Sequence, residues 1–364
     1  MKLIVDSHLD LAWNALVMNR DLSRSLVDLN ASEADSRDAP FRGRATTVLP
    51  EMRAGNVCMC LGTLVAGASS KGGAARFTFS AVEIANSFAV GQLNYYERLA
   101  DRGQVRLIRT RKELTAHIAE WERDNDTRRA KLPVGIIVAF EGCDSITTPS
   151  EAALWYERGV RCASLVHYGY GRYAGGTGTT AQLEPAGREL LAEFDRLGMI
   201  LDLTHLSDRA FFEVIDAFRG PVLASHQNCR ALVPRERQFT DEQLRIAIDR
   251  GGVIGVACDN WMLSPTWPAQ NSGAAPPARE TIPISALADH IDHICQLAGS
   301  PHHAAIGSDL DGGFGAEQSP HGLDAIADLQ KLDEILTTRG YSPSDVALVL
   351  GGNWIRFFHE HLPA

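Results

Sequence analysis

Short apolar runs alternate with longer amphipathic blocks along most of the chain. Short apolar runs bounded by polar or turn-forming residues are typical of buried strands, and longer blocks with a helical period are typical of helices. The eight strand candidates are Lys2–Ser7, Val57–Val65, Val134–Phe140, Arg161–Val166, Met199–Thr204, Val222–Ser225, Val253–Ala257 and Ala305–Ser308. The helix-like blocks include Ser80–Arg102, Glu113–Asp124, Pro185–Leu197, Ile284–Ala298, Leu323–Arg339 and Ser344–His361. This alternation predicts an α/β fold, a (β/α)8 or TIM barrel.

Three longer segments interrupt the alternation: Arg20–Pro50, Gly169–Thr180 and Ser264–Pro283. They follow the first, fourth and seventh strand candidates. We therefore expect all three at the carboxyl ends of the strands, where the loops of such barrels shape specificity. The chain shows no linker and no repeat beyond the alternation, so residues 1–364 are expected to form a single domain.

The composition of the chain limits which partners and which cell compartment are expected. The formal net charge of -10 argues against nucleic acid, because phosphate binding needs a basic surface. The apolar run at the N-terminus meets charged residues too soon for a signal peptide, and no apolar stretch approaches the roughly 20 residues of a membrane helix. The seven cysteines are odd in number and scattered, which favours a reduced compartment. We expect a cytoplasmic protein without a membrane anchor.

Polar residues with metal-binding chemistry stand at the ends of the strand candidates. His8 and Asp10 are two residues apart, so in a strand they point to the same side and can converge on one ion. Four further groups each follow an apolar run directly: Glu141, His205, His226 and Asp309. Polar groups placed repeatedly at the carboxyl ends of buried strands are typical of the active face of a parallel barrel.

Five of these residues, His8, Asp10, Glu141, His205 and His226, offer three imidazoles and two carboxylates. That mixture suits zinc or a similar divalent ion, and five ligands fit two metals that share a bridge better than one open tetrahedral site. The bridge must be anionic, either a carboxylate or a carboxylated lysine. None of the five lysines ends a strand candidate, which leaves Glu141 as the expected bridge.

Ordered motifs along nearly the whole chain carry a family resemblance. They are Asp6-Ser7-His8-Leu9-Asp10, Met52-Arg53-Ala54-Gly55, Phe140-Glu141-Gly142, Gly187-Arg188-Glu189-Leu190, Arg196–Met199, Asp202–Ser207, Ser225-His226, Arg230-Ala231-Leu232, Asp289–His293, Gly307–Gly312 and Leu350–Asn353. In these motifs the chain resembles the membrane dipeptidase (renal dipeptidase) family, zinc dipeptidases of the amidohydrolase superfamily. The resemblance implies two Zn²⁺ per chain, with other divalent ions as alternatives. His8 and Asp10 would hold one, His205 and His226 the other, and Glu141 both.

The same resemblance implies a small dipeptide-like substrate with a free C-terminal carboxylate, which could include L-Xaa-D-Xaa dipeptides, and a homodimer. His167 matches the histidine that contacts the scissile carbonyl. Arg230 matches the arginine that holds the carboxylate, a role that suits a guanidinium fork. Asp309 matches the carboxylate that takes a proton from the attacking water and passes it to the leaving amine.

Some segments depart from the family pattern. Tyr168–Tyr173 replaces Asn-rich elements after His167, and Arg235–Gln238 replaces an Arg-Asn pair, so the side-chain pockets are expected to differ. Two alternatives stay open: a metal-dependent hydrolase of another small amide, lactone or ester, and a non-catalytic barrel that binds a small ligand. His290 and His293 lie one helical turn apart, and we expect a solvated helix face there in preference to a zinc clip.

Overall fold

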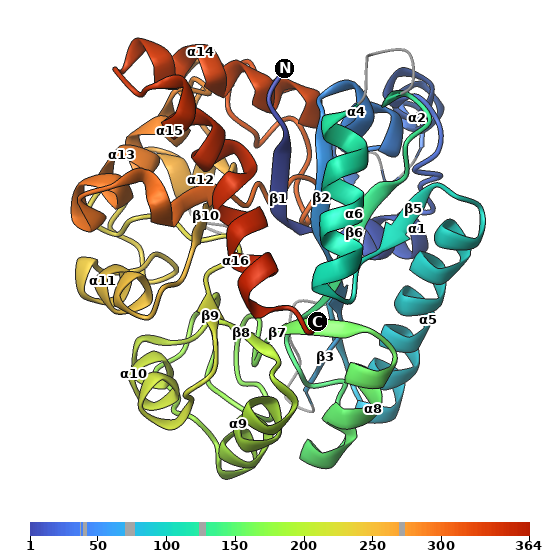
Figure 1. Ribbon diagram of the computed structural model, residues 1–364, viewed down its shortest axis with the longest axis vertical. Coiled ribbons are helices and arrows are strands. Elements are labelled where there is room, and N and C mark those ends of the chain that lie inside the picture. The colour runs from blue at the N-terminus through green and yellow to red at the C-terminus, as the bar shows by residue number, and fades with distance from the viewer. Residues whose placement is uncertain (37, 39–41, 70–76, 124–128, 269–273) are drawn as a thin grey trace.

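The computed structural model describes residues 1–36, 38, 42–69, 77–123, 129–268 and 274–364. Its centre is a barrel of eight parallel strands surrounded by helices, which confirms the predicted (β/α)8 fold (Figure 1). The barrel strands are β1 (Ile4–Leu9), β2 (Val57–Val65), β6 (Val134–Glu141), β7 (Val160–Ser164), β8 (Ile200–Asp202), β9 (Val222–Leu223), β10 (Ile254–Val256) and β11 (Ala304–Ile306). Nearly all of their residues are buried, as expected for parallel strands covered on both faces.

The strands follow one another in the order β10-β11-β1-β2-β6-β7-β8-β9, and the two ends of this order meet. Ala224 and Ile254 form a parallel bridge, and the N–H of Gly255 donates to the carbonyl of Ala224 at 2.8 Å. The sheet therefore closes on itself. Short strands lie outside this path: β5 (Val105–Leu107) pairs with the first half of β6, and β3 (Gly67–Ala68) pairs with β4 (Thr78–Phe79).

Helices surround the barrel, and the C-terminal helix α16 packs against α6 (Figure 1). The α-helices are α1 (Leu11–Val17), α2 (Leu26–Glu33), α4 (Leu49–Ala54), α5 (Val82–Asp101), α6 (Arg111–Glu122), α8 (Ala152–Glu157), α9 (Pro185–Leu197), α10 (Asp208–Ala217), α11 (Asp241–Asp249), α12 (Asn260–Leu263), α13 (Ala286–Ala298), α14 (Lys331–Thr338), α15 (Pro343–Ala347) and α16 (Asn353–His361). The 3₁₀ turns are η1 (Pro149–Glu151), η2 (Arg279–Thr281), η3 (Pro301–His303) and η4 (Ile326–Gln330), and η5 (Leu348–Gly352) is a π-helical turn. None of the described helices combines the length and apolar character needed to cross a membrane.

The predicted elements correspond to observed ones, with shifted boundaries. Strand β1 runs to Leu9 and not only to Ser7, so His8 lies within the strand. Helix α6 begins two residues earlier than expected because Thr110 caps it: the Thr110 hydroxyl accepts from the N–H of Glu113, whose carboxylate accepts from the N–H of Thr110. Parts of the predicted helix 113–124 and of the predicted insertions 20–50 and 264–283 lie outside the described residues.

Two glycines let the chain approach itself closely beside the barrel strands. A Cβ atom built on Gly307 would lie 1.8 Å from the carbonyl oxygen of Ser225, and one on Gly255 would lie 2.1 Å from it. The Ser7 hydroxyl donates to the same carbonyl at 2.5 Å and to that of Ile306 at 3.1 Å. Strands β1, β10 and β11 therefore hold the segment that precedes His226, and this close packing leaves no room for a side chain at either glycine.

Gly307→Ala should consequently lower the free energy of unfolding, by about 1–3 kcal/mol if the cost is that of overpacking a core. Gly91→Ala is the matched control, because Gly91 lies inside α5 and a Cβ there would meet no atom within 4 Å. Alanine at an open helical position should raise stability by up to ~1 kcal/mol. Urea unfolding measures the free energy of unfolding of both variants. An equal change in the two variants would show that the close packing against Ser225 does not exclude a side chain at position 307.

Candidate metal centre

The carboxylate of Glu141, the last residue of β6, lies at the middle of a ring of imidazoles. Its Oε1 atom is 3.3–3.6 Å from the Nε2 atoms of four histidines: His8 at 3.4 Å, His167 at 3.6 Å, His205 at 3.3 Å and His226 at 3.6 Å. Only 4% of Glu141 is exposed. The histidines come from the carboxyl ends of β1, β7, β8 and β9, as the sequence pattern predicted.

Two further carboxylates complete the cluster next to His8. Asp10 Oδ1 lies 3.7 Å from His8 Nε2, and Asp309 Oδ1 lies 3.9 Å from the same atom. The hydroxyl of Thr63, from β2, donates to Asp10 Oδ1. The structure therefore brings together every site residue expected from the sequence except Arg230.

These side chains form three overlapping groups whose ligand atoms lie within 4.8 Å of one another: His8, His226 and Asp309; Glu141, His205 and His226; and His8, Asp10 and Glu141. His8 Nε2 and Glu141 Oε2 are buried without a hydrogen-bond partner among the described residues. Buried polar atoms without partners are costly, and a cation between them would satisfy both. Imidazoles and carboxylates are also the donors that zinc takes in catalytic sites, so the residues fit a divalent metal.

Hydroxyl groups behind the rings fix the orientation of the imidazoles. Thr177 Oγ1 lies 3.0 Å from His205 Nδ1, and Ser225 Oγ lies 2.9 Å from His226 Nδ1 and 3.3 Å from His8 Nδ1. With the proton on Nδ1, Nε2 of His205 and Nε2 of His226 keep their lone pairs and point toward Glu141. Such partners behind metal-binding histidines set both the tautomer and the orientation of the ring.

Burial and neighbouring charges set the protonation of the cluster. Burial lowers the pKa of His205 and His226 well below the usual value, and the charge of Arg237 lowers both further, so both rings are neutral. Burial opposes ionisation of Glu141, but electrostatic interactions with His167 and His8 and hydrogen bonds from His205 and His8 hold its pKa well below the usual range. Burial raises the pKa of Asp309 well above the usual value. Burial opposes protonation of His8, but the charge of Glu141 raises its pKa to about 10. The cluster thus contains neutral imidazoles at His205 and His226, a protonated His8 and the ionised Glu141.

Two site residues have a left-handed backbone: φ is 70° at His205 and 57° at Asp309. Positive φ is uncommon outside glycine and is tolerated where surrounding contacts fix the chain. Asp202 provides such contacts before His205, since its Oδ1 accepts from the N–H and hydroxyl of Thr204 and from the N–H of Ser225. These turns bring both side chains into the cluster directly after their strands.

Arg230, the residue expected to hold the substrate carboxylate, makes its hydrogen bonds to groups outside the cluster. Its guanidinium forms a bidentate pair with Asp208 at 2.7 and 2.8 Å. Arg237 takes the position beside the imidazoles: it donates to Gln227 Oε1 at 2.5 Å and to the carbonyl of His226 at 3.0 Å, and it lies 3.3 Å from His205 Nε2. Spacing in the sequence could not identify Arg237, because both arginines lie in an irregular segment after β9.

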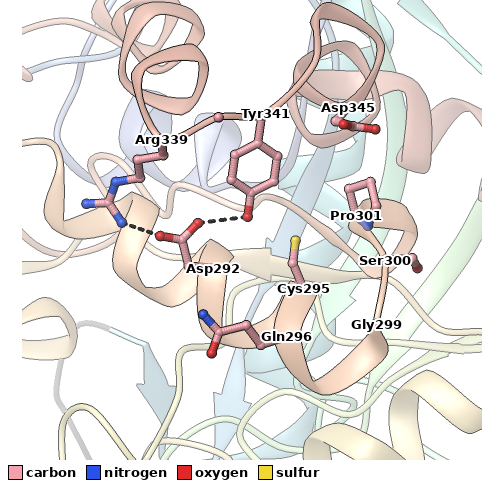
Figure 2. A pocket seen from close by; sticks show the side chains of 10 residues that line it. Asp292, Cys295, Gln296, Gly299, Ser300, Pro301, Arg339, Tyr341 and Asp345 are labelled. Carbon is pink, nitrogen blue, oxygen red and sulfur yellow. Dashed lines mark hydrogen bonds and ion pairs between the residues drawn. The ribbon is translucent and has the colours of Figure 1, made fainter.

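Two other places that could bind a ligand, His290 and a surface cavity, have polar groups that are already bonded within the protein. His290 is buried and its Nδ1 accepts from the N–H of Cys229, so the expectation of a solvated helix face was wrong there. A surface cavity of about 300 Å³ lies beside α13, close to the amino end of β11, and Figure 2 shows its lining. Its Asp292 accepts from Arg339 at 2.5 Å and from Tyr341 at 2.7 Å, which leaves this carboxylate paired at the end of the barrel opposite the metal centre.

A parallel barrel with a buried cluster of imidazoles and carboxylates at the carboxyl ends of its strands has the architecture of a metal-dependent hydrolase. Residues 1–362 match the sequence model of the membrane dipeptidase family, peptidase family M19, and the chain belongs to this family. The family resemblance of the motifs is thereby confirmed.

One curated relative and two solved structures are similar to this chain. The dipeptidase aclJ of Aspergillus oryzae is 31% identical over 229 residues, which cover 61% of this chain and 50% of that protein. This chain thus spans about half the length of that relative. The probable dipeptidase PvdM from Pseudomonas aeruginosa has a similar fold, with a TM-score of 0.77 at 18% identity over 99% of this chain and 96% of that one. A metallopeptidase from Rhodobacter sphaeroides, bound to a phosphinate mimic of L-Ala-D-Ala, gives 0.72 at 22% identity and full coverage of both chains.

Proposed function

We propose that the protein is a binuclear zinc dipeptidase that hydrolyses dipeptides with a free C-terminal carboxylate. The observation that carries the proposal is the ring of four imidazoles around Glu141, with the guanidinium of Arg237 beside it. The dipeptide mimic bound to the Rhodobacter neighbour supports including L-Xaa-D-Xaa dipeptides among the substrates. The free, mostly buried cysteines support a reduced, cytoplasmic compartment, and the family resemblance supports a homodimer.

His8 and Asp10 would hold one zinc ion, His205 and His226 the other, and Glu141 would bridge them. Two such ions would lower the pKa of a shared water and polarise the scissile carbonyl. The protein's contribution is the fixed position of the ligands. The hydroxyls behind the rings and the buried strand ends hold Nε2 of each histidine toward Glu141.

Two residues of the cluster remain for proton transfer and for the charge that develops on the substrate. Asp309 would accept the proton of the attacking water and deliver it to the leaving amine. Its carboxylate lies 3.9 Å from His8 Nε2, next to the place of the proposed metals. His167 would donate a hydrogen bond from Nε2 to the carbonyl oxygen as that oxygen becomes negative. Its ring faces Glu141 at 3.6 Å, and burial lowers its pKa, so it is a neutral donor.

Arg237 is better placed than Arg230 to bind the substrate carboxylate. Only 4% of Arg237 is exposed, and no described carboxylate lies within ion-pair distance of it. A buried guanidinium without an anionic partner is compensated when a carboxylate binds. Arg230 is already neutralised by Asp208, so a substrate would have to break that pair first.

The first test of this proposal is the metal content of the purified protein. Elemental analysis should find about two divalent ions per chain, and His205→Ala should lose about one of them and nearly all turnover. His293→Ala is the control, because His293 pairs with Asp241 away from the cluster and should keep both ions. A native protein without metal, or a fully active His205→Ala variant, would contradict the assignment.

Asp309→Asn tests the proton transfer. The substitution keeps the shape of the side chain and removes its ability to carry the proton, so kcat should fall by about 10²–10⁴-fold while metal content and fold persist. Steady-state kinetics together with elemental analysis measure both quantities. Asp289→Asn, which alters only a surface ion pair with Arg339, should leave kcat unchanged. Activity within a few-fold of wild type in Asp309→Asn would assign Asp309 a structural role.

A pair of arginine variants tests the carboxylate site. Arg237→Met should raise KM for a dipeptide and reduce kcat/KM by an amount that corresponds to roughly 2–5 kcal/mol, the cost of removing one partner of a buried charged pair. The same variant should do much less on the dipeptide amide, which has no carboxylate. Arg230→Met should change kcat/KM little on either substrate. Equal losses on dipeptide and amide would instead favour hydrolysis of a substrate that needs no carboxylate.

A further inference from the structure

A buried carboxylate that the proposed reaction does not use lies at the same face of the barrel. Asp259 follows β10, and the N–H of Cys258 donates to the carbonyl of Ser308 at 2.9 Å. This bond joins the segment after β10 to the segment after β11. Asp259 directly follows Cys258 and Asp309 directly follows Ser308, so the two aspartates lie in neighbouring segments. Only 5% of Asp259 is exposed.

One oxygen of Asp259 is fully engaged and the other is not. Oδ1 accepts from the N–H of Trp261 and from Nε2 of Gln318, both at 2.8 Å. Within the described part of the chain no group donates to Oδ2, and no cationic side chain lies within ion-pair distance. Burial raises the pKa of Asp259 to about 6, although the charges of Arg237 and Arg235 lower it. The role of Asp259 as N-cap of α12 explains Oδ1 but leaves Oδ2 without a function.

An aromatic ring adjoins the same space. Tyr168 follows His167, and 42% of the residue is exposed. Its ring centroid lies 4.8 Å from that of His167 and 5.0 Å from that of His205. Burial raises the pKa of Tyr168, the charge of Arg237 lowers it, and the charge of Asp259 raises it. Tyr168 and Arg237 thus both lie against the ring of His205, at the same face of the barrel as Asp259.

We propose that Asp259 and Tyr168 form a subsite for a basic side chain on the C-terminal residue of the substrate. The inference rests on the proposed function, which places the carboxylate of that residue at Arg237. The side chain of the same residue then lies near the unengaged oxygen of Asp259 and the exposed ring of Tyr168. A carboxylate and an aromatic face both attract an ammonium or guanidinium group, so the two residues favour lysine, ornithine or arginine at this position.

Asp259→Asn is a sharp test, because asparagine keeps the Oδ1 acceptor for Trp261 and Gln318 and removes only the charge. The substrates are Gly-Lys and Gly-norleucine, whose side chains differ only by the terminal ammonium. Wild type should prefer Gly-Lys. The variant should lose about tenfold or more in kcat/KM on Gly-Lys, mainly through KM, and less than about threefold on Gly-norleucine. Tyr168→Leu should reduce the preference in the same direction, since it removes the ring.

The outcomes separate this inference from the function on which it rests. Hydrolysis of both dipeptides by wild type without preference for lysine would overturn the subsite and leave the dipeptidase intact. An equal loss of kcat/KM on both substrates in Asp259→Asn would also overturn the subsite, because the residue would then serve the reaction centre or the fold. If the metal-loaded wild type hydrolyses neither dipeptide, the proposed function fails and the subsite fails with it.

Discussion

The carboxylate of Glu141 is buried in the barrel and lies within 3.6 Å of four imidazole nitrogens. An ionised group in such a place is unfavourable unless positive charge or hydrogen bonds compensate it. The nearby histidines provide part of this compensation, and a divalent cation would complete it. Since the four rings come from four different strands, the cluster forms only when the barrel is closed. Closure of the sheet at Ala224 and Ile254 is therefore a condition for the site.

Buried carboxylates in the layer behind the cluster make the positions of its residues rigid. Asp6 accepts from the N–H groups of His8 and Ser308, which joins the end of β1 to the end of β11. Asp202 joins the segment after β8 to Ser225 in the same way. The hydroxyls of Thr177 and Ser225 lie behind the histidine rings, and Gly255 and Gly307 pack closely against the carbonyl of Ser225. The segments that carry His8, His205 and His226 are thus held by neighbouring strand ends, which is the preorganisation that metal binding and catalysis require.

The sequence by itself determined the fold and most of the cluster. The alternation of apolar runs and amphipathic blocks predicts the barrel because burial on both faces demands continuous apolar strands. His8, Glu141 and His226 could be found because each stands at or next to the end of its strand, and parallel topology brings all such ends to one face. Helix boundaries were less certain, as α6 shows, because a capping residue outside the amphipathic pattern decides where the helix begins.

Only the tertiary structure decided which side chains surround the cluster. Arg230 and Arg237 lie in one irregular segment, and the pairing of Arg230 with Asp208 on α10 leaves Arg237 at the imidazoles. Asp259 likewise has a sequence context that indicates only a helix cap, and its place beside Asp309 follows from the bond between β10 and β11 ends. The position of a residue in a strand can be predicted from the periodic pattern of apolar residues in the sequence. Residues in loops receive theirs from contacts between segments far apart in the chain, and no local pattern encodes those contacts.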